Sequence, residues 1–486
     1  MKGKTLEDFA QAHDPTFRIE APTTVYAREL PSTTVFIITA AQNATPVHAE
    51  FWRVLECISA ERKAERLVIP IRYKNPTSTW GGSQRNADYW APEVRPFLWN
   101  VRHALNQNLT LLADIKIQPT ASSPLTGAEA ISLASSGIIG HPKVQTRAIA
   151  TPQSAMAKLL MTTGACTQAN YTDSRAGRIG EFHHSLSALI VEIVGKRFHI
   201  RRLHFDVKSK SVTDLDRRYF ADRSEKAPPA LALVMGDTHV DFVDPAVVRA
   251  TFGKGGITET CRPKHLVWHD LLDGYSCNPH HFGNPFNALA KREHEADDVR
   301  AEVNRAIEFV RKHTPKGAES VVVSSNHDDF LRRWIVLTDW RRDPVNARFY
   351  LETALAMVQG TKLTSSGTEY PSPFPYWFEK AKVPNARVLC TDESFTLAGV
   401  ELGQHGDRGP NGARGSIKNM RRLGTKTIIG HSHSPGEDEG STQTGTSTRL
   451  RLEYNGGPSS WLNAHCLLNA DGKRQLIVVV DGEWRQ

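Results

Sequence analysis

The sequence lacks any apolar run long enough to cross a membrane. Its longest apolar stretches, Val35–Ala41 and Leu476–Val480, have the length of strands, whereas a transmembrane helix needs about 20 apolar residues. The first 14 residues carry three acidic side chains and have no apolar core of the kind that marks a signal peptide. These absences exclude an integral membrane protein and predict a cytoplasmic protein with no membrane partner.

Cysteine is scarce, and its spacing excludes two further classes. The chain has 6 cysteines, and none of them forms a C-x-x-C pair. That pattern offers neither a zinc knuckle nor a disulfide framework. We therefore expect reduced thiols with mostly structural roles.

The remaining composition is that of a globular protein. Hydrophobic residues make up 40% of the 486 residues and charged residues 23%, which are ordinary values. A chain of this length exceeds one compact core, so two domains are expected. The net charge of +8 weakly favours a polyanionic partner.

Residues 1–205 are interpreted as an N-terminal α/β domain. The apolar segments Val35–Ala41, Leu67–Ile71 and Leu111–Ile117 have strand length, and a helical pattern begins at Pro46. Strands that alternate with helices indicate a parallel sheet. A hairpin is predicted at 186–205, with its turn at Gly195–Lys196.

Residues 206–229 are polar, end in Ala-Pro-Pro and are interpreted as a linker. The second domain, 230–486, starts with the predicted strand Leu231–Met235. Apolar residues that recur every three or four positions predict one long helix, Asn287–His313, with a solvated charged face. The Gly-, Ser- and Thr-rich stretch Ser434–Thr448 is interpreted as a loop.

Five short polar motifs follow apolar strands of the second domain. They are Gly236-Asp237-Thr238-His239, His269-Asp270-Leu271-Leu272-Asp273, Ser324-Ser325-Asn326-His327-Asp328, Gly403-Gln404-His405-Gly406 and Gly430-His431-Ser432-His433. The carboxyl ends of neighbouring strands in an α/β sheet converge on one crevice. Asp, Asn and His donors suit manganese, iron or zinc, and a shared carboxylate can hold two such ions about 3.5–4 Å apart.

The order of these motifs resembles the signature of the calcineurin-like metallophosphoesterases. That signature reads D-x-H, G-D-x-x-D, G-N-H-D, a lone His before Gly, and G-H-x-H, and it covers roughly residues 230–435 here. The sequence departs from it where His269 and Ser325 replace glycines. The resemblance implies an α/β fold in which a C-terminal β-sandwich is flanked by helices and preceded by a separate N-terminal α/β domain.

The resemblance also implies roles for individual residues. Two divalent metal ions, expected to be manganese with iron and zinc as alternatives, would share Asp270. The other implied ligands are Asp237, His239 and His433 for the first ion, and Asn326, His405 and His431 for the second. His327 would steady the scissile phosphate and protonate the leaving oxygen, with Asp328 orienting its ring. His269 is interpreted as structural, an additional metal donor being the less favoured alternative.

Motif details narrow the substrate. Protein phosphatases of this superfamily continue the second motif into D-R-G and end the third in Glu. Here Asp273 is followed by Gly274, and the third motif ends in Asp328. What remains are DNA exonucleases of the SbcD type, cyclic-nucleotide enzymes and small nucleotide hydrolases. The overall layout is also similar to phage-encoded nucleases that degrade DNA, which would place the protein in the host cytoplasm.

A basic, glycine-rich segment lies between the last two motifs. Its cations, the candidate nucleic-acid contacts, are Arg408, Arg414, Lys418, Arg421 and Arg422. Such a segment can follow a phosphate backbone, although a solvated basic loop explains it equally well. In the N-terminal domain, Gln42 and Asn43 follow the first strand and could line a ligand crevice. A packing or homo-oligomer surface is the favoured interpretation there, and the role of this domain stays open.

The preferred hypothesis is a manganese-dependent DNA nuclease, an exonuclease or another DNA-degrading enzyme, which hydrolyses phosphodiesters with a metal-activated hydroxide. The alternative is a small-molecule or nucleotide phosphodiesterase or phosphatase on the same dinuclear site. The third hypothesis is a non-catalytic scaffold, in which the metal ions only stabilise a binding surface.

Overall fold

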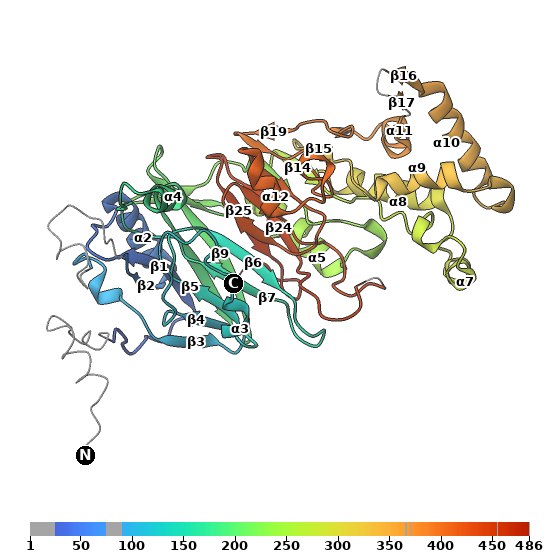
Figure 1. Cartoon of the computed structure of the whole chain (residues 1–486). Coiled ribbons are helices and arrows are strands. Elements are labelled where there is room, and N and C mark those ends of the chain that lie inside the picture. Colours follow the sequence, from blue (N-terminus) through green and yellow to red (C-terminus); the bar gives the residue numbers. More distant parts are fainter. Residues whose placement is uncertain (1–24, 74–89, 365–366, 370, 454, 486) are drawn as a thin grey trace, which may run out of the picture.

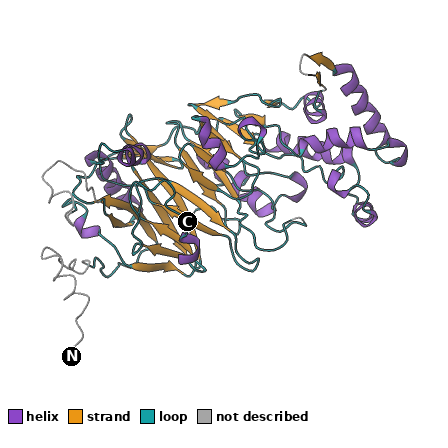
Figure 2. Ribbon diagram, in the orientation of Figure 1, coloured by secondary structure: helices purple, strands orange, loops and turns teal. Residues whose placement is uncertain are grey.

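The chain is a mixed α/β protein with several mixed sheets and a helical arm at one end (Figures 1 and 2). The computed structural model describes residues 25–73, 90–364, 367–369, 371–453 and 455–485. The N-terminal segment without signal-peptide features lies outside these ranges. No helix within them has both the length and the apolar character to cross a bilayer. All 6 cysteines are unpaired, and four of them are buried.

The N-terminal half is built on a seven-stranded sheet with the order β12-β11-β10-β9-β8-β1-β2. Strands β1 (Val35–Gln42) and β2 (Glu65–Ile71) are parallel and are connected by helix α2 (Ala49–Arg62), which confirms three predicted elements. The predicted hairpin is also present, as β8 (Ser187–Val194) and β9 (Arg197–Asp206). Because β8 lies antiparallel beside β1, the sheet is mixed, and the prediction of a parallel sheet was wrong.

Residues 206–229 are part of the same sheet. They form β10 (Ser211–Asp214), β11 (Arg217–Tyr219) and β12 (Ser224–Lys226), which continue antiparallel from β9. Their charged side chains suggested a linker, but several of these charges are paired within the fold. Asp214, for example, is buried and accepts two hydrogen bonds from Arg201.

A ten-stranded sheet joins the two halves of the chain. Its order is β19-β20-β21-β23-β22-β6-β7-β5-β4-β3. Its strands are β3 (Arg102–Asn106), β4 (Leu109–Leu112), β5 (Ser136–Ile139), β6 (Gln145–Ile149), β7 (Lys158–Thr162), β19 (Thr396–Leu397), β20 (Val400–Glu401), β21 (Lys426–Ile429), β22 (Gly436–Asp438) and β23 (Ser441–Gln443). Strand β22 pairs antiparallel with β6, Glu437 opposite Thr146. The sequence had suggested that the N-terminal half is a separate domain. The shared sheet shows instead that the two halves are joined. Strand β4 takes up only the start of the predicted strand at 111–117.

A six-stranded sheet forms the centre of the C-terminal half. In spatial order its strands are β18 (Ala386–Val388), β15 (Glu319–Val322), β14 (His265–Trp268), β13 (Ala232–Val234), β24 (Ala464–Leu468) and β25 (Arg474–Val478). An apolar cluster unites residues of this sheet, such as Val234 and Val267, with Val400 and Ile428 of the ten-stranded sheet. A second and larger cluster packs Leu233, Trp268 and Val322 against helices. One face of the sheet thus meets strands and the other meets helices.

The long helix predicted at 287–313 is in fact two helices. Helix α7 (Pro285–Glu293) ends before Glu295, which has a left-handed φ of 52°. Asp298 then caps the N-terminus of helix α8 (Val299–His313), and its side chain accepts a hydrogen bond from the Ala301 amide. The apolar spacing continues across this break, and for that reason the sequence did not reveal it.

The segment 434–448, predicted to be a loop, supplies β22 and β23 and buries Thr444, Thr446 and Thr448. Gln42 and Asn43 are also structural. Both are buried, Gln42 donates to the Asn170 carbonyl, and Asn43 accepts from the Tyr73 amide. Neither lines an open crevice.

The arm visible in Figure 1 consists of α9 (Asp328–Leu337), α10 (Ala347–Gly360) and α11 (Pro373–Lys380), together with α7 and α8. Helix α9 begins directly at the third motif, so the arm is anchored at the edge of the candidate site.

Candidate metal centre

All five motifs leave the carboxyl ends of strands, as predicted. Asp237 and His239 follow β13, Asp270 follows β14, Asn326 follows β15, His405 follows β20, and His431 and His433 follow β21. Strands β13, β14 and β15 are parallel neighbours, as are β20 and β21. The first three motifs therefore extend from the six-stranded sheet and the last two from the ten-stranded sheet. The apolar cluster between the two sheets sets the distance between these two groups of motifs.

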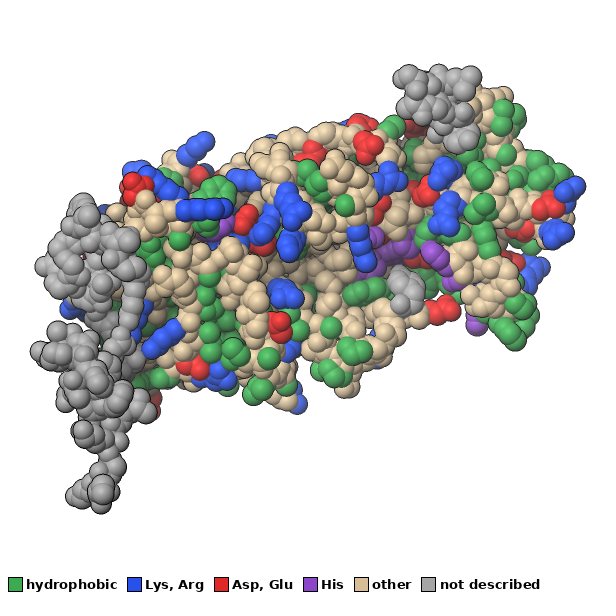
Figure 3. Space-filling view, viewed as in Figure 1, with side chains coloured by type: hydrophobic (Ala, Val, Ile, Leu, Met, Phe, Trp, Pro, Cys, Tyr) green, Lys and Arg blue, Asp and Glu red, His purple; other side chains and the backbone are tan. Residues whose placement is uncertain are grey.

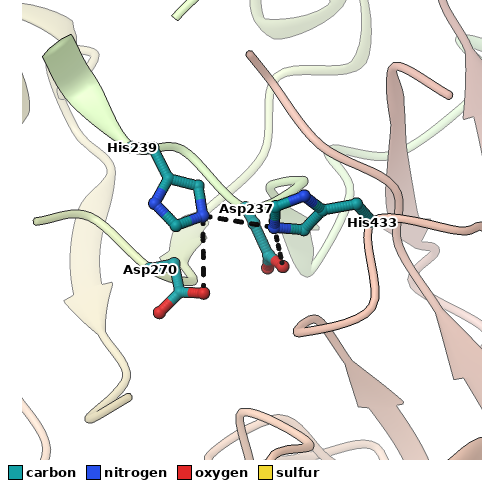
Figure 4. A group of neighbouring side chains, drawn as sticks. All are labelled: Asp237, His239, Asp270 and His433. Carbon is teal, nitrogen blue, oxygen red and sulfur yellow. Dashed lines mark hydrogen bonds and ion pairs between the residues drawn. The ribbon is translucent and has the colours of Figure 1, made fainter. Parts of the chain in front are cut away.

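Four of these side chains form one tight group (Figure 4). Nε2 of His239 lies 3.2 Å from Nε2 of His433 and 3.5 Å from Oδ2 of Asp270. Nε2 of His433 lies 3.1 Å from Oδ2 of Asp237. One donor atom from each of the four residues falls within 4.8 Å of all the others.

The other predicted ligands extend this group from Asp270. Nε2 of His405 lies 3.2 Å from Oδ2 of Asp270. Nδ1 of His431 lies 3.1 Å from Oδ1 of Asn326, and the rings of His405 and His431 are 5.3 Å apart. Oδ2 of Asp270 thus contacts one histidine of each set, His239 and His405, and all seven predicted ligands lie in one continuous cluster.

The donor atoms have the character that a cation requires. Asp237 and Asp270 are 0% and 1% exposed, and Oδ1 of each accepts no hydrogen bond from the described residues. A buried carboxylate without donors or a counter-charge is costly. Carboxylates and imidazoles at these separations can bind a metal ion, which would satisfy the unpaired oxygens.

The backbone at the cluster is strained. His239, Asp270, His431 and His433 have φ values of 41°, 41°, 76° and 58°. Side chains other than glycine adopt the left-handed region at a cost of order 1–3 kcal/mol each, and such residues gather at functional sites. The strain turns these four side chains inward from the ends of their strands.

The charges of the cluster are strongly coupled. Burial by itself would raise the pKa of Asp270, but His405 and His327 outweigh it and hold that pKa well below 3.8. Burial would lower the pKa of His405, yet Asp270 raises it to about 9. Burial would also lower the pKa of His239, but Asp273 and Asp270 raise that pKa to about 9. The buried carboxylates are therefore stabilised by positive charge nearby. When no metal ion is bound, protons on the neighbouring histidines supply this charge.

His327 lies beside the first group and is held by Asp273. Its Nδ1 lies 2.6 Å from the Asp273 carbonyl oxygen, and its ring is 4.6 Å from the ring of His239. The Asp273 carboxylate lies 2.9 Å from Nδ1 of His239. The Asp328 carboxylate accepts from the Ser325 amide instead. The sequence-based assignment of Asp328 as the residue that orients His327 is therefore corrected to Asp273.

Glu302 was missed because the charged face of its helix was interpreted as solvated. It lies on α8, is 3% exposed, and accepts hydrogen bonds from the Tyr275 and Ser276 amides, both at 2.9 Å, and from the Ser276 hydroxyl. Burial raises its pKa to about 7. It fixes the segment that directly follows Asp273. The apolar neighbours of Glu302 in the helical pattern were the available signal.

His269 packs behind the cluster. It is 0% exposed, its Nδ1 lies 3.4 Å from Nδ1 of His405, and burial lowers its pKa to about 4. A neutral ring against His405 fits the structural role that we favoured.

The site opens to the surface beside His405. Figure 3 shows histidine side chains gathered in a hollow between the sheets and the arm. A cavity of about 370 Å³ is lined by His405 and Ser325 and carries four carboxylates and two guanidinium groups, those of Asp328, Asp329, Asp392, Asp407, Arg332 and Arg408.

The basic segment does not act as one surface. Arg408, Arg414, Lys418 and Arg422 are exposed. Arg421 is instead engaged by Asp438 at 2.8 Å and Glu439 at 3.3 Å. Arg408 is exposed but also contacts Asp407 at 3.5 Å. Of the five predicted nucleic-acid contacts, Arg408 and Arg421 therefore already have acidic partners, and Arg414, Lys418 and Arg422 are the exposed cations for which no ion pair forms among the described residues.

The fold and the site define a mixed α/β protein with a buried cluster of His and Asp side chains that can bind a metal ion. No protein-family model matches the chain. The chain is 30% identical over 464 residues to Protein A1 of Escherichia phage T5, an alignment that covers 92% of this chain and 82% of that protein. The chain therefore belongs to the same family as the phage protein.

Proposed function

We propose that the chain is a two-metal phosphodiesterase of the calcineurin-like type that acts on DNA. The observation that supports this most directly is the convergence of seven donor residues from five strand ends around Asp270. Two ions sharing that carboxylate would supply a nucleophile near neutral pH and neutralise charge on the phosphate. The roles of the chain's own residues follow from their positions.

Asp270 would hold both ions, with Asp237, His239 and His433 on one side and Asn326, His405 and His431 on the other. Five of these residues, Asp237, His239, Asp270, His405 and His433, are buried, which keeps bulk water from competing for their donor atoms. The strained backbone fixes the donors before a metal arrives, which lowers the cost of assembling the site.

His327 would contact the phosphate. Because its Nδ1 faces the Asp273 carbonyl, Nε2 remains for a phosphate or leaving oxygen, at the edge of the His239 ring. A side chain so placed can stabilise developing charge and deliver a proton. Asp273 would act as the positioning residue for both His239 and His327.

DNA as the substrate is supported by the exposed cations Arg408, Arg414, Lys418 and Arg422, on the segment that begins at His405. The relationship to a phage protein is consistent with action in an infected cell. The purified chain loaded with Mn²⁺ should degrade linear DNA. Metal-loaded protein that leaves both single- and double-stranded DNA intact would rule out the nuclease assignment.

A small-molecule phosphodiesterase is the second candidate, and the cavity beside His405 favours it. The two guanidinium groups already contact carboxylates, Arg332 with Asp329 and Arg408 with Asp407, so the lining offers a long polyanion little attraction, whereas a small diester needs only the metals. Hydrolysis of bis-(4-nitrophenyl) phosphate without any action on DNA would decide for this candidate.

A further inference from the structure

A second cavity, of about 500 Å³, lies outside the metal centre, where the two halves of the chain meet. It is enclosed by the end of α4 (Arg175–His183), the segment 421–426, the turn after β22 and the start of β25. The pairing of β6 with β22 fixes these segments relative to one another.

The acidic side chains of this cavity are already neutralised. Glu437 is paired with Arg202 at 3.0 Å. Glu439 is engaged by Lys143 at 3.0 Å and by Arg421 at 3.3 Å. Asp206 and Asp471 act electrostatically on Lys473, and Glu437 acts on Arg474. No carboxylate of the described residues forms an ion pair with the other cations of the cavity.

Three further cations line the cavity: Lys426, Lys473 and Arg474. Arg474 donates to the carbonyl oxygens of Glu439 and Gly440, and neither neutralises its charge. Burial lowers the pKa of Lys426, and both Arg474 and Lys473 lower it further. The lining of the cavity thus carries five Lys and Arg side chains against two carboxylates, and this excess of positive charge favours an anionic ligand.

An aromatic ring completes the lining. Phe182, in the last turn of α4, is 79% exposed and borders the same cavity. An exposed aromatic face can stack a nucleobase, while the three cations can bind phosphate oxygens.

We propose that this cavity binds a nucleotide, with its phosphate between Lys426, Lys473 and Arg474 and its base against Phe182. The cavity volume suits a ligand of this size. Strand β21 runs from Lys426 at the cavity to Ile429, two residues before His431 of the metal cluster. A bound nucleotide would therefore contact the strand that leads directly to two of the proposed metal ligands, His431 and His433.

The test is isothermal titration of the full chain with deoxyadenosine monophosphate and, separately, with inorganic phosphate. The double variant Lys426→Gln/Lys473→Gln should bind the nucleotide at least tenfold more weakly. The matched variant Lys196→Gln/Lys254→Gln removes the same charge from exposed positions that do not line the cavity, and it should bind normally. Thermal unfolding of each variant checks that the fold is retained.

Two further variants separate this site from its alternatives. Phe182→Ala should weaken binding of the nucleotide but not of phosphate, and equal loss or no loss for both would overturn the nucleotide assignment. Asp270→Asn should retain nucleotide binding even where the proposed metal function fails. If Asp270→Asn abolished binding while Lys426→Gln/Lys473→Gln did not, the nucleotide would be binding at the metal cluster and the proposal would be wrong.

Discussion

Replacing Glu302 by alanine tests whether the helical arm positions the metal centre. Glu302 is the carboxylate of α8 that accepts from the Tyr275 and Ser276 amides and from the Ser276 hydroxyl. Those residues follow Asp273, which contacts both His239 and His327. The substitution leaves all proposed ligands in place and removes only the group that fixes this segment.

The size of the effect follows from the hydrogen bonds. Leaving a buried donor unsatisfied costs about 1–3 kcal/mol, and two amide donors of Tyr275 and Ser276 lose their acceptor. Part of this cost disappears if water enters the space of the missing side chain. We therefore expect Glu302→Ala to lower the free energy of unfolding by about 3 kcal/mol. Loosening of Asp273 should also lower kcat about tenfold or more, with a smaller change in KM.

Urea unfolding and the hydrolysis of bis-(4-nitrophenyl) phosphate measure these two effects. The control is Glu308→Ala on the same helix, where Glu308 pairs with Arg311 in an exposed i,i+3 contact that should contribute less than about 1 kcal/mol. If Glu302→Ala were as stable and as active as the control, the carboxylate would not be holding the Asp273 segment, and the reasoning would be refuted.

Three other outcomes are expected. His327→Ala should lower kcat by about 10²–10⁴-fold with the metal content unchanged by elemental analysis, and a loss of metal would instead make it a ligand. Gly430→Ala should abolish metal binding, because its Cβ would lie 2.2 Å from Oδ1 of Asp237, whereas Gly440→Ala meets nothing closer than 3.7 Å and should bind normally. In metal-free protein, burial raises the pKa of Glu302 from 4.5 to about 7, so its stabilising contribution is present below about pH 4.5 and is lost as the pH rises through about 7. Urea midpoints measured against pH should show this fall in the unmodified chain but not in Glu302→Gln, and parallel profiles would contradict it.

The metal cluster was predictable because its information is local. Each motif is a few residues long and directly follows an apolar strand, and the rule that strand ends converge did not depend on the order of strands in the sheets. The role of Asp273 was not predictable in the same way. The contact of its backbone carbonyl with His327 depends on the turn that follows β14, and a carbonyl leaves no signature in a sequence.

The errors in the fold arose where a tertiary partner decides the structure. Residues 434–448 have a loop-like composition, yet Thr442, Thr444 and Thr446 are buried at 0–1% exposure because strands from both halves pair around them. Likewise, the polar segment 206–229 became three strands because β9 offered it an edge. Strand β6, the partner of β22, lies far away in the sequence. Strand β9 directly precedes the segment 206–229, but the polar composition of that segment still favoured the wrong assignment.

The shared sheet also changes what the N-terminal half can do. A separate module could grip DNA and move relative to the metal centre. Here Glu437 of β22 is buried against Arg202 of β9, and β22 itself pairs with β6. Since the buried ion pair and the ladder would both have to break for the halves to separate, such motion is costly. The N-terminal half is therefore held rigidly against the C-terminal half. A ligand bound where the two halves meet would influence the metal centre through β21 and not through a hinge motion.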